Sequence, residues 1–334
     1  MLRAASVGLG WWSDELATAI QGKSEAIRIV SCFSRSADKR AAFAQKFTAR
    51  AHDSFDALLA DPEIDAVILT TPHSLHGEHV RQVAAAGKHV FVEKPFALDA
   101  DDAHAALDAC KQAGVTLAIG HNRRFAPAVL RLREMLEADE FGTVLHAEAN
   151  FSGSGALRYA PGYWRANRAE SPGGAIAALG IHMIDSLTWL LGPVLRVTAQ
   201  AGRRAVAVDI DDTTSALFTF ARGPTGYLGT LFACPYTSTL HIFGSLANAF
   251  AGVDGNTLIV HRAGGSPEPV ALAPVDTLRA ELEEFAAACR GEAAFRVRPE
   301  EALHDVEVMQ AMVASAATGG RPVSLAAAES PLQT

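Results

Sequence analysis

The chain has 334 residues, a length that suits two domains, each with its own hydrophobic core. Apolar residues make up 49% of it, which excludes a disordered chain. The net charge of −8 argues against a nucleic-acid-binding protein, because such a protein needs a basic face. No apolar run reaches the length of a membrane span, so no membrane partner is expected.

The four cysteines, Cys32, Cys110, Cys234 and Cys289, lie far apart and form no CxxC pair. We expect buried free thiols rather than a disulfide framework or a zinc site. The first strand is expected to begin near Arg3, which leaves no room for a signal peptide before it. The predicted location is therefore the cytoplasm.

Residues 1–122 alternate short apolar runs with amphipathic stretches. The expected strands are Ala4–Gly8, Ile27–Phe33, Ala66–Thr70, His89–Val92 and Thr116–Ile119. The expected helices include Asp38–Phe47, His73–Ala86 and Asp99–Gln112. Continuous apolar strands separated by helices are typical of a parallel sheet covered on both faces. We therefore predict a doubly wound Rossmann domain over residues 1–122.

Residues 123–334 have a different pattern of apolar residues. A helix is expected over Ala126–Ala138, a strand over Val144–Phe151, and a further helix that Ser171 caps and Gly192-Pro193 ends. Period-2 segments then recur between Val194 and Val260, namely Arg196–Ala201, Thr214–Phe220 and Gly226–Phe232. Two helices, Asp276–Cys289 and Pro299–Thr318, close the chain. The fold class is thus α/β, with a C-terminal α+β domain that holds a large, mostly antiparallel open sheet.

A glycine-rich segment follows the first expected strand directly. It reads Gly8-Leu9-Gly10-Trp11-Trp12-Ser13, the dinucleotide fingerprint with Ser13 in place of its third glycine. The two glycines let the backbone turn and approach a pyrophosphate, which meets the positive end of the next helix. The third position needs only a small residue, so Ser13 is compatible with this function. The segment predicts a nicotinamide dinucleotide cofactor.

The end of the second expected strand addresses the choice between NAD and NADP. An acidic residue there typically holds the ribose hydroxyls of NAD, but this chain has Ser34-Arg35-Ser36, followed by Lys39 and Arg40. Arginine and serine can hydrogen-bond a 2′-phosphate, which a carboxylate would repel. We predict NADP as the cofactor, with NAD possible. The alternative is that these cations are the solvated start of a helix.

Several short motifs together resemble the glucose–fructose oxidoreductase / inositol dehydrogenase (Gfo/Idh/MocA) family over essentially the full chain. The motifs are Gly8-Leu9-Gly10, Thr71-Pro72 with His76, Gly87 to Pro95, Gly120 to Phe125, Trp164-Arg165, and Gly173-Gly174 leading to His182 and Asp185. The resemblance implies that Thr71, Pro72 and His76 lie along the cofactor. It also implies that Asn122, Arg123, Trp164 and Arg165 lie near the nicotinamide end.

The resemblance implies, further, that Glu93-Lys94-Pro95 brings Lys94 beside the nicotinamide, usually through a cis-proline. An exposed lysine is a poor base, but in a closed pocket beside the positively charged ring its pKa should fall toward neutrality. Lys94 is then the main candidate to exchange a proton with a substrate hydroxyl. The alternative is a surface lysine at a strand end.

His182 lies in an expected helix with Asp185 three residues later, so both side chains share one helix face. The imidazole can hydrogen-bond the reacting oxygen or share the proton with Lys94, with Asp185 in support. The alternative is a core histidine. Dehydrogenases of the family usually carry Asp four residues before that histidine, whereas this chain has Ala178. Three explanations compete for the missing Asp. Asp185 takes over part of its role, a carboxylate of the substrate supplies the charge, or the chemistry is different or absent.

Other polar and aromatic residues are candidates for substrate binding. Tyr159 and Tyr163 fall in expected pocket loops, where aromatic faces can stack on sugars; packing is the alternative. Tyr236 follows an expected strand of the second domain and can reach the site from the side of the sheet. Arg158, Arg165 and Arg168 are candidates for a carboxylate or a phosphate. His73, His76 and His79 do not share one helix face, so we expect no metal site.

Together these features predict an NAD(P)-dependent oxidoreductase that moves hydride between nicotinamide and a secondary alcohol or ketone of a sugar, polyol or cyclic diol. Ala178 leaves a second class open, a catalytically silent nucleotide-binding sensor or scaffold. A lyase or isomerase with tightly held NAD is a third possibility. The expected partners are a small-molecule substrate, for which a sugar, a polyol and a carboxylated ring are the candidates, and further copies of the chain. These copies are expected to form a homodimer or homotetramer through the open face of the C-terminal sheet.

Overall fold

The computed structural model describes residues 1–326. Its contacts divide the chain into two compact units. The first comprises Met1–Asn122 and Asp276–Leu303, and the second comprises Arg123–Val275 and the chain from His304 onward. None of the described helices is both long and apolar enough to cross a membrane.

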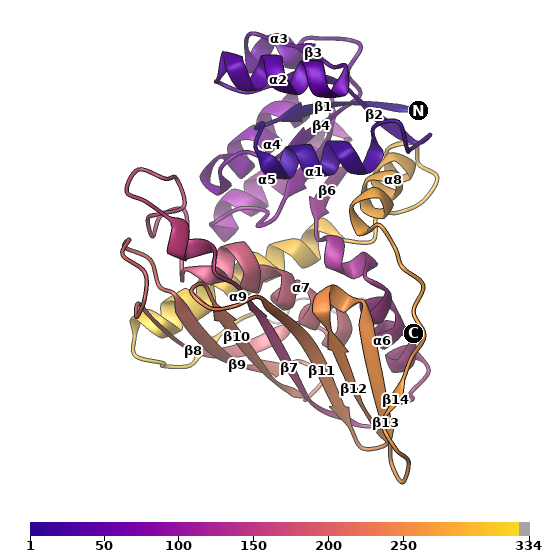
Figure 1. Ribbon diagram of the computed structural model, residues 1–334, viewed down its shortest axis with the longest axis vertical. Helices are drawn as coiled ribbons and strands as arrows, with labels where there is room; N and C mark the ends of the chain where they lie inside the picture. The colour runs from indigo at the N-terminus through magenta and orange to yellow at the C-terminus, as the bar shows by residue number, and fades with distance from the viewer. Residues whose placement is uncertain (327–334) are drawn as a thin grey trace. The chain divides into compact units, whose positions relative to one another are not determined.

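The first unit is built on a six-stranded sheet in the order β3-β2-β1-β4-β5-β6, and all neighbouring strands are parallel (Figure 1). The strands are β1 (Leu2–Val7), β2 (Ile27–Phe33), β3 (Arg50–Ala51), β4 (Ala66–Leu69), β5 (His89–Glu93) and β6 (Leu117–Gly120). The predicted Rossmann fold is confirmed. The strand order reverses between β1 and β4, and doubly wound sheets bind ligands at this switch point, outside the carboxyl ends of the strands.

Helices connect these strands, and side chains cap the first turns of three of them. They are α1 (Trp11–Ile20), α2 (Ala37–Phe47), α3 (Phe55–Leu59), the short η1 (His73–Leu75), α4 (His76–Ala85) and α5 (Ala100–Ala113). The side chains of Ser36, Ser54 and Asp99 accept hydrogen bonds from backbone N–H groups at the starts of α2, α3 and α5. A single 3₁₀ turn, η2 (Asn122–Phe125), follows β6.

The structure groups α8 (Thr277–Cys289) with the first unit, whereas the sequence placed residues 276–303 in the second domain. Asp276 caps this helix, and the buried Phe285 ring meets the Phe91 ring of β5 edge-on at 5.6 Å between centroids. An amphipathic pattern shows that a helix has a buried face but not which core covers that face. Sequence position alone therefore assigned α8 to the later domain.

The second unit contains a nine-stranded sheet in the order β14-β13-β12-β11-β7-β10-β9-β8-β15. The strands are β7 (Val144–Ser152), β8 (Val194–Gly202), β9 (Thr213–Phe220), β10 (Thr225–Leu231), β11 (Thr237–Gly244), β12 (Ala247–Gly252), β13 (Thr257–Arg262), β14 (Glu268–Pro269) and β15 (Val323–Ser324). Among the described strands of this nine-stranded sheet, only β10 and β7 pair in parallel. The predicted mostly antiparallel sheet is confirmed.

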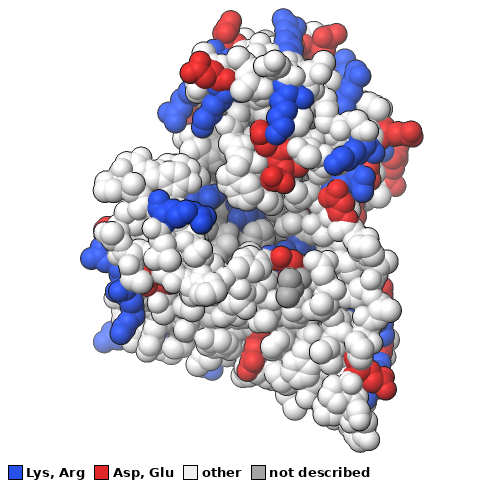
Figure 2. Space-filling model, viewed as in Figure 1, with Lys and Arg blue, Asp and Glu red and all other residues white. Residues whose placement is uncertain are grey.

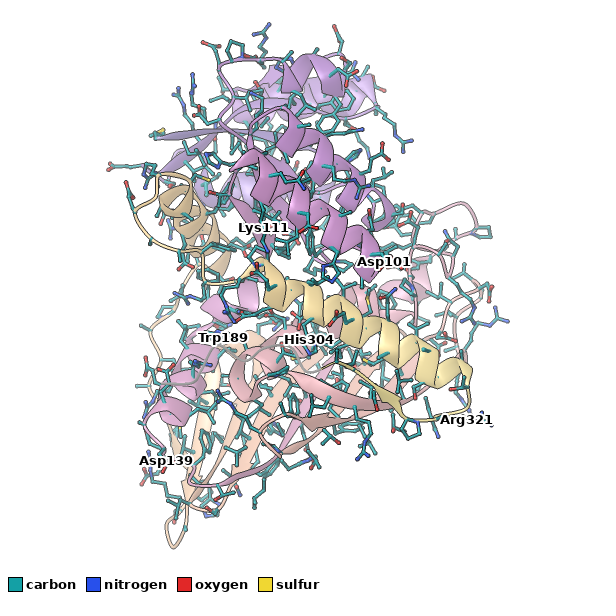
Figure 3. The ribbon with its side chains drawn as sticks, turned by 180° about the vertical axis from the view of Figure 1, so that it is seen from behind. Asp101, Lys111, Asp139, Trp189, His304 and Arg321 are labelled. Carbon is teal, nitrogen blue, oxygen red and sulfur yellow. The ribbon has the colours of Figure 1, made fainter. Side chains whose placement is uncertain are left out.

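Helices cover one face of this sheet. They are α6 (Pro127–Glu137), α7 (Ile181–Leu191) and α9 (Pro299–Ala317), with the short turns η3 (Gly155–Arg158), η4 (Ile176–Gly180) and η5 (Val253–Gly255) between elements. Seen from behind, α9 runs across the sheet from His304 toward Arg321 (Figure 3). The ring of His304 accepts a hydrogen bond at 3.0 Å from the backbone N–H of Val194, which opens β8.

The helix that carries His182 begins later than expected. Ser171 does not cap it; the Ser171 hydroxyl donates instead to the carbonyl oxygen of Arg165 at 2.9 Å. Gly173 and Gly174 adopt positive φ, and a π-helical turn from Ile176 to Gly180 runs directly into α7. The expected cap is wrong because the two glycines turn the chain before any helical hydrogen bond forms.

The other face of the sheet is turned to the viewer in Figure 1 and carries few charged groups (Figure 2). The strand register aligns one outward row across six strands: Ile259, Phe250, His241, Glu148, Tyr227 and Leu217. Ile259, Tyr227 and Leu217 are exposed. A broad, weakly charged sheet face is typical of an interface.

Self-association through this open face stays a prediction. We expect light scattering at micromolar concentration to show a dimer or tetramer, and Leu217→Arg to shift it toward the monomer. The matched change Leu157→Arg, at an equally exposed leucine in η3, should leave the mass unchanged. A monomeric unmodified protein would contradict the prediction.

The cysteines are free, as expected. Burial raises the pKa of Cys32 to about 11 and that of Cys110 to about 12, so these thiols stay protonated and unreactive. Cys234 and Cys289 are only half-buried, which corrects the expectation that all four are buried. Burial nevertheless raises the pKa of Cys289 to about 12.

Candidate functional site

The glycine turn after β1 has the backbone geometry that the fingerprint predicts. Gly8 has a φ of +93°, and a Cβ there would lie 2.7 Å from the backbone of Thr70. The Thr70 hydroxyl donates to the Gly8 carbonyl oxygen at 2.6 Å, which ties the turn to β4. Only glycine fits this position, because any side chain would be strained and would clash.

The start of α1 has room for an anion. Gly10 precedes the helix, and within the described residues no side chain caps the first turn. The Ser13 hydroxyl donates to the Gly10 carbonyl oxygen at 2.7 Å, and Ser13 is buried, as a small packing residue should be. A Cβ at Gly10 would meet nothing within 4 Å. Uncapped N–H groups and an open approach fit the pyrophosphate of a dinucleotide.

The turn between β2 and α2 gives its basic residues different roles. Arg40 donates to the carbonyl oxygens of Ser34 at 2.8 Å and Arg35 at 3.4 Å, so its guanidinium holds the turn. Arg35 and Lys39 are exposed. Ser34, Arg35 and Lys39 are therefore the residues of this turn best placed to meet a ligand, whereas Arg40 positions their backbone.

A hollow of about 290 Å³ opens between the first turn of α1 and the side of α2. It is lined by Leu9, Gly10, Trp11, Asp14, Lys39, Ala42, Phe43 and Lys46. Lys46 and Asp14 form an ion pair of 2.8 Å in its wall, and Trp11 is 67% exposed. The hollow joins the glycine turn to Lys39, which adds a cationic side chain beside the expected cofactor site.

His76 links two loops at the carboxyl edge of the parallel sheet. Its Nδ1 lies 2.7 Å from the Pro95 carbonyl oxygen, and its Nε2 lies 2.9 Å from the Thr71 carbonyl oxygen. Burial lowers the pKa of His76 to about 4, so the neutral ring donates to one of the two carbonyls at pH 7. The Thr71 hydroxyl meets Nδ1 of His79 at 3.1 Å. The Thr71-Pro72 loop and the Pro95 turn are thus held together.

The Glu93-Lys94-Pro95 turn ends β5 at this edge. The Lys94–Pro95 peptide bond is cis, as the resemblance implied. Glu93 is buried, with its carboxylate packed against Gly120 of β6, and it accepts from the backbone N–H of Lys94 at 3.2 Å. The Lys94 side chain is only half-buried. Asn122 follows β6, and its amide donates to the Thr277 hydroxyl of α8 at 3.1 Å.

In the second unit, buried His182 lies in the first turn of α7, with its ring centroid 5.6 Å from that of Phe151 in β7. Asp185 has a different setting. Its Oδ1 accepts from Nε of Arg124 at 2.9 Å and lies 2.7 Å from Arg124 Nη2, and neither side chain is exposed. Asp185 is thus one half of a buried ion pair between η2 and α7.

A second carboxyl group joins this ion pair. The Thr188 hydroxyl donates to Asp305 of α9 at 2.8 Å. Burial, followed by the negative charge of Asp185, raises the pKa of Asp305 well above its usual range, while the Arg124 charge opposes the shift. Asp305 therefore keeps its proton more readily than an exposed carboxyl group, and the Arg124 charge is left to balance Asp185.

Aromatic residues gather in the loop between β7 and η4. Ring centroids lie 4.8 Å apart for Tyr159 and Tyr163, and the Arg165 guanidinium lies 4.4 Å from the Trp164 ring centroid. Burial raises the pKa of the Tyr159 phenol. Arg168 is held by Asp211, at 2.6 Å from Nη1, and is not a free cation for a ligand. This ion pair argues against the expected carboxylate site at Arg168.

Arg123 and Tyr236 come together in the second unit. Arg123 donates to Ser238 at 3.1 Å, to Asp254 at 2.7 Å and, weakly, to the Tyr236 hydroxyl at 3.5 Å. Tyr236 donates to the same Asp254 oxygen. The family resemblance implied that Arg123 lies near the nicotinamide, and Tyr236 was a candidate for the substrate. Sequence reasoning missed Asp254, because it looked like an ordinary turn residue before glycine.

Comparisons with known proteins agree with this geometry. Residues 2–121 match the model of the oxidoreductase family with an NAD-binding Rossmann fold, and residues 129–249 match the model of the GFO/IDH/MocA C-terminal domain. A D-xylose 1-dehydrogenase (NADP⁺) from Haloferax volcanii is 31% identical over 280 residues, covering 80% of this chain and 83% of that protein. The chain belongs to the Gfo/Idh/MocA family.

Further members of the Gfo/Idh/MocA family extend the comparison. A UDP-N-acetylglucosamine 3-dehydrogenase from Acidithiobacillus ferrooxidans is 33% identical, over 77% of this chain and 80% of that protein. Among solved structures, a proposed NADPH-dependent oxidoreductase from Desulfitobacterium hafniense superposes with a TM-score of 0.92 at 33% identity, with 97% of both chains covered. This chain is accordingly an oxidoreductase of the family with an NAD(P)-binding domain.

Ala178, where Gfo/Idh/MocA dehydrogenases usually carry Asp, lies in the π-helical turn before α7. It is 8% exposed and belongs to a cluster of buried apolar side chains. The other members are Ala156, Ala175, Val206, Val208, Ile210 and Phe232. Ala178 therefore packs against apolar side chains, and an ionised carboxylate there would lose hydration.

Proposed function

We propose that the chain transfers hydride between NADP and a secondary alcohol or ketone of a sugar or polyol. The observation that carries the proposal is the bond pattern of His76, which fastens the Lys94-Pro95 turn to the Thr71 loop at the carboxyl edge of the sheet. Oxidation of an alcohol releases a proton together with the hydride, so the reaction needs a proton-transfer group, and Lys94 at this edge can serve as one.

Different residues bind the cofactor, take up the proton and position the helices. The glycine turn and the uncapped start of α1 bind the pyrophosphate, and the Thr71-Pro72 loop orients the cofactor. When bound, the nicotinamide accepts or returns hydride. Lys94 takes the proton of the substrate hydroxyl, and its half-buried environment limits its hydration. His182 of the second unit is the candidate that hydrogen-bonds the substrate. Asp185 forms a buried ion pair with Arg124, so it positions α7 and does not move a proton.

The test is an absorbance assay at the reduced-nicotinamide band with NADP⁺ and a panel of aldoses, alditols and cyclic diols. Turnover of at least one neutral polyol or sugar is the expected result. If the protein binds the cofactor but no compound of the panel is oxidised or reduced, the proposal is wrong. A burst limited to one equivalent of protein would instead indicate tightly held NAD that is oxidised and reduced in one catalytic cycle.

The preference for NADP rests on the turn after β2. Ser34, Arg35 and Lys39 are available to hold a 2′-phosphate, and no acidic side chain stands at the end of β2. We expect Arg35→Ala to weaken NADP binding by about 1–3 kcal/mol, as for a lost hydrogen bond to a charged group, and to leave NAD binding unchanged. Calorimetry of both cofactors measures this.

Arg28→Ala is the matched control for that experiment, since Arg28 is an exposed arginine near the opposite end of β2. It should change neither affinity. Equal affinities of the unmodified protein for NAD and NADP would contradict the preference.

A second candidate function is a nucleotide-binding sensor without catalysis. The apolar surroundings of Ala178 favour it, because the family carboxylate is replaced and its position is packed with hydrophobic side chains. Such a protein would bind NADP in calorimetry and show no change at the reduced-nicotinamide band with any substrate.

A further inference from the structure

Arg123, Asp254 and Tyr236 form a polar cluster within the second unit, whose charges and hydrogen-bond directions can be followed atom by atom. The Arg123 guanidinium lies 4.0 Å from the Phe151 ring centroid, and the Tyr236 ring meets Phe151 edge-on at 5.8 Å. The same Phe151 ring lies 5.6 Å from His182. One aromatic ring therefore connects the cluster to the histidine that the proposed function assigns to the substrate.

The backbone fixes the position of Asp254. This residue has a φ of 57°, which is uncommon for a residue other than glycine and is best tolerated by Asp and Asn. Gly255 next to it approaches Ala126 of the segment before α6 so closely that a Cβ would lie 2.7 Å from the Ala126 Cβ. The turn is thus pressed against a neighbouring element, and it presents the carboxylate to Arg123 and Tyr236.

The hydrogen-bond directions decide what the cluster offers to a ligand. A phenol has one proton, and Tyr236 gives it to Asp254, since a carboxylate can only accept. The second Asp254 oxygen then remains as an acceptor, and the Tyr236 oxygen, which accepts only the long 3.5 Å bond from Arg123, keeps capacity for one more donor. The side chains are 55% and 44% exposed, so solvent and ligands can reach them. Arg123 is held by Asp254 at 2.7 Å, and its charge is balanced.

We propose that Arg123, Asp254 and Tyr236 form a hydroxyl-recognition site that selects neutral polyhydroxylated substrates over sugar acids. Acceptor oxygens bind the O–H donors of a sugar or polyol. A substrate carboxylate brings only acceptors and a negative charge, which Asp254 repels and Arg123 is not free to bind. This inference rests on the proposed function and narrows its substrate class to neutral compounds.

The decisive variant is Asp254→Asn, which keeps the size of the side chain and tolerates the same backbone conformation. It removes the negative charge, releases Arg123 and lets Tyr236 donate. The ratio of kcat/KM for a neutral aldose or alditol to that for the matching aldonic or uronic acid should fall about tenfold or more, the effect of one hydrogen bond to a charged group. Tyr236→Phe should lower kcat/KM for the neutral substrate alone.

Asp139→Asn is the matched control, because Asp139 also has a positive φ, of 55°, and lies after α6 outside the cluster. The ratio should stay unchanged in this variant. The contact itself has an independent readout, since burial and Asp254 raise the pKa of Tyr236 while Arg123 lowers it. The tyrosinate absorbance of Tyr236, identified by its loss in Tyr236→Phe, should therefore appear at lower pH in Asp254→Asn.

Calorimetry of the NADP-loaded protein separates this inference from the proposed function. If no substrate is turned over but neutral polyols bind and Asp254→Asn weakens their binding, the proposed function fails and the recognition site stands. If neutral polyols are turned over but Asp254→Asn leaves the ratio unchanged, the recognition site is wrong and the function stands. Tighter binding of sugar acids than of neutral polyols by the unmodified protein would also overturn it, as would the absence of any polyol binding.

Discussion

Lys94→Ala lowers kcat on the best substrate of the panel by about 100-fold or more, the usual contribution of a positioned acid–base group. The expectation follows from the position of Lys94 at the end of β5, in a turn that His76 fastens to the Thr71 loop. The substituted alanine can take no proton from the substrate hydroxyl. Steady-state kinetics and calorimetry with NADP measure the effect on catalysis and on cofactor binding separately.

NADP binding should survive this substitution, because the glycine turn and the turn after β2 hold the pyrophosphate and the ribose. Lys23→Ala, at an exposed lysine, is the control and should leave kcat unchanged. A Lys94→Ala protein with normal kcat would exclude Lys94 as the proton-transfer group. A matching loss of NADP affinity would instead point to a role in holding the cofactor.

Ala178→Asp examines the departure from the family. A carboxylate among Ile210, Phe232 and the other apolar side chains of its cluster would lose hydration, so its pKa should rise and the unit should lose stability. We therefore expect no gain of activity on polyols. A gain would show that the missing carboxylate alone limits the site.

Arg124→Met is expected to have the largest effect on stability, a loss of about 3–5 kcal/mol in the free energy of unfolding. Arg124 and Asp185 are both fully buried, and the substitution leaves the Asp185 carboxylate without its cation, next to Asp305. Urea unfolding followed by fluorescence measures the loss. Trp189 is a local reporter, because the Arg124 guanidinium lies 5.4 Å from its ring centroid.

The double variant Arg124→Met, Asp185→Leu shows whether the single variant loses stability through the unpaired Asp185 charge or through lost packing. Replacing both partners of a buried ion pair with apolar residues is often nearly neutral, so most of the stability should return. Lys111→Met is the control, since its ion pair with Glu300 is more than half exposed on both sides and should contribute at most about 1 kcal/mol. A double variant as unstable as the single one would contradict this account.

The sequence determined the parts of the protein that depend on neighbouring residues. The glycine turn and the parallel strands of the first unit follow from patterns a few residues long. Backbone conformation, side-chain periodicity and capping act over that range, so the Rossmann fold and the cofactor turn could be predicted. The resemblance to the family also predicted the cis peptide bond before Pro95, which the structure contains.

Only the tertiary structure decided the contacts between residues that are distant in the chain. Arg123 meets Asp254 across 131 positions, and Arg124 meets Asp185 across 61. No local pattern distinguishes these arginines, which are adjacent in sequence, yet one guanidinium is fully buried in an ion pair and the other borders an exposed tyrosine. The position of each side chain depends on how the sheet and helices pack, because burial and ion pairing are properties of the assembled core rather than of a segment.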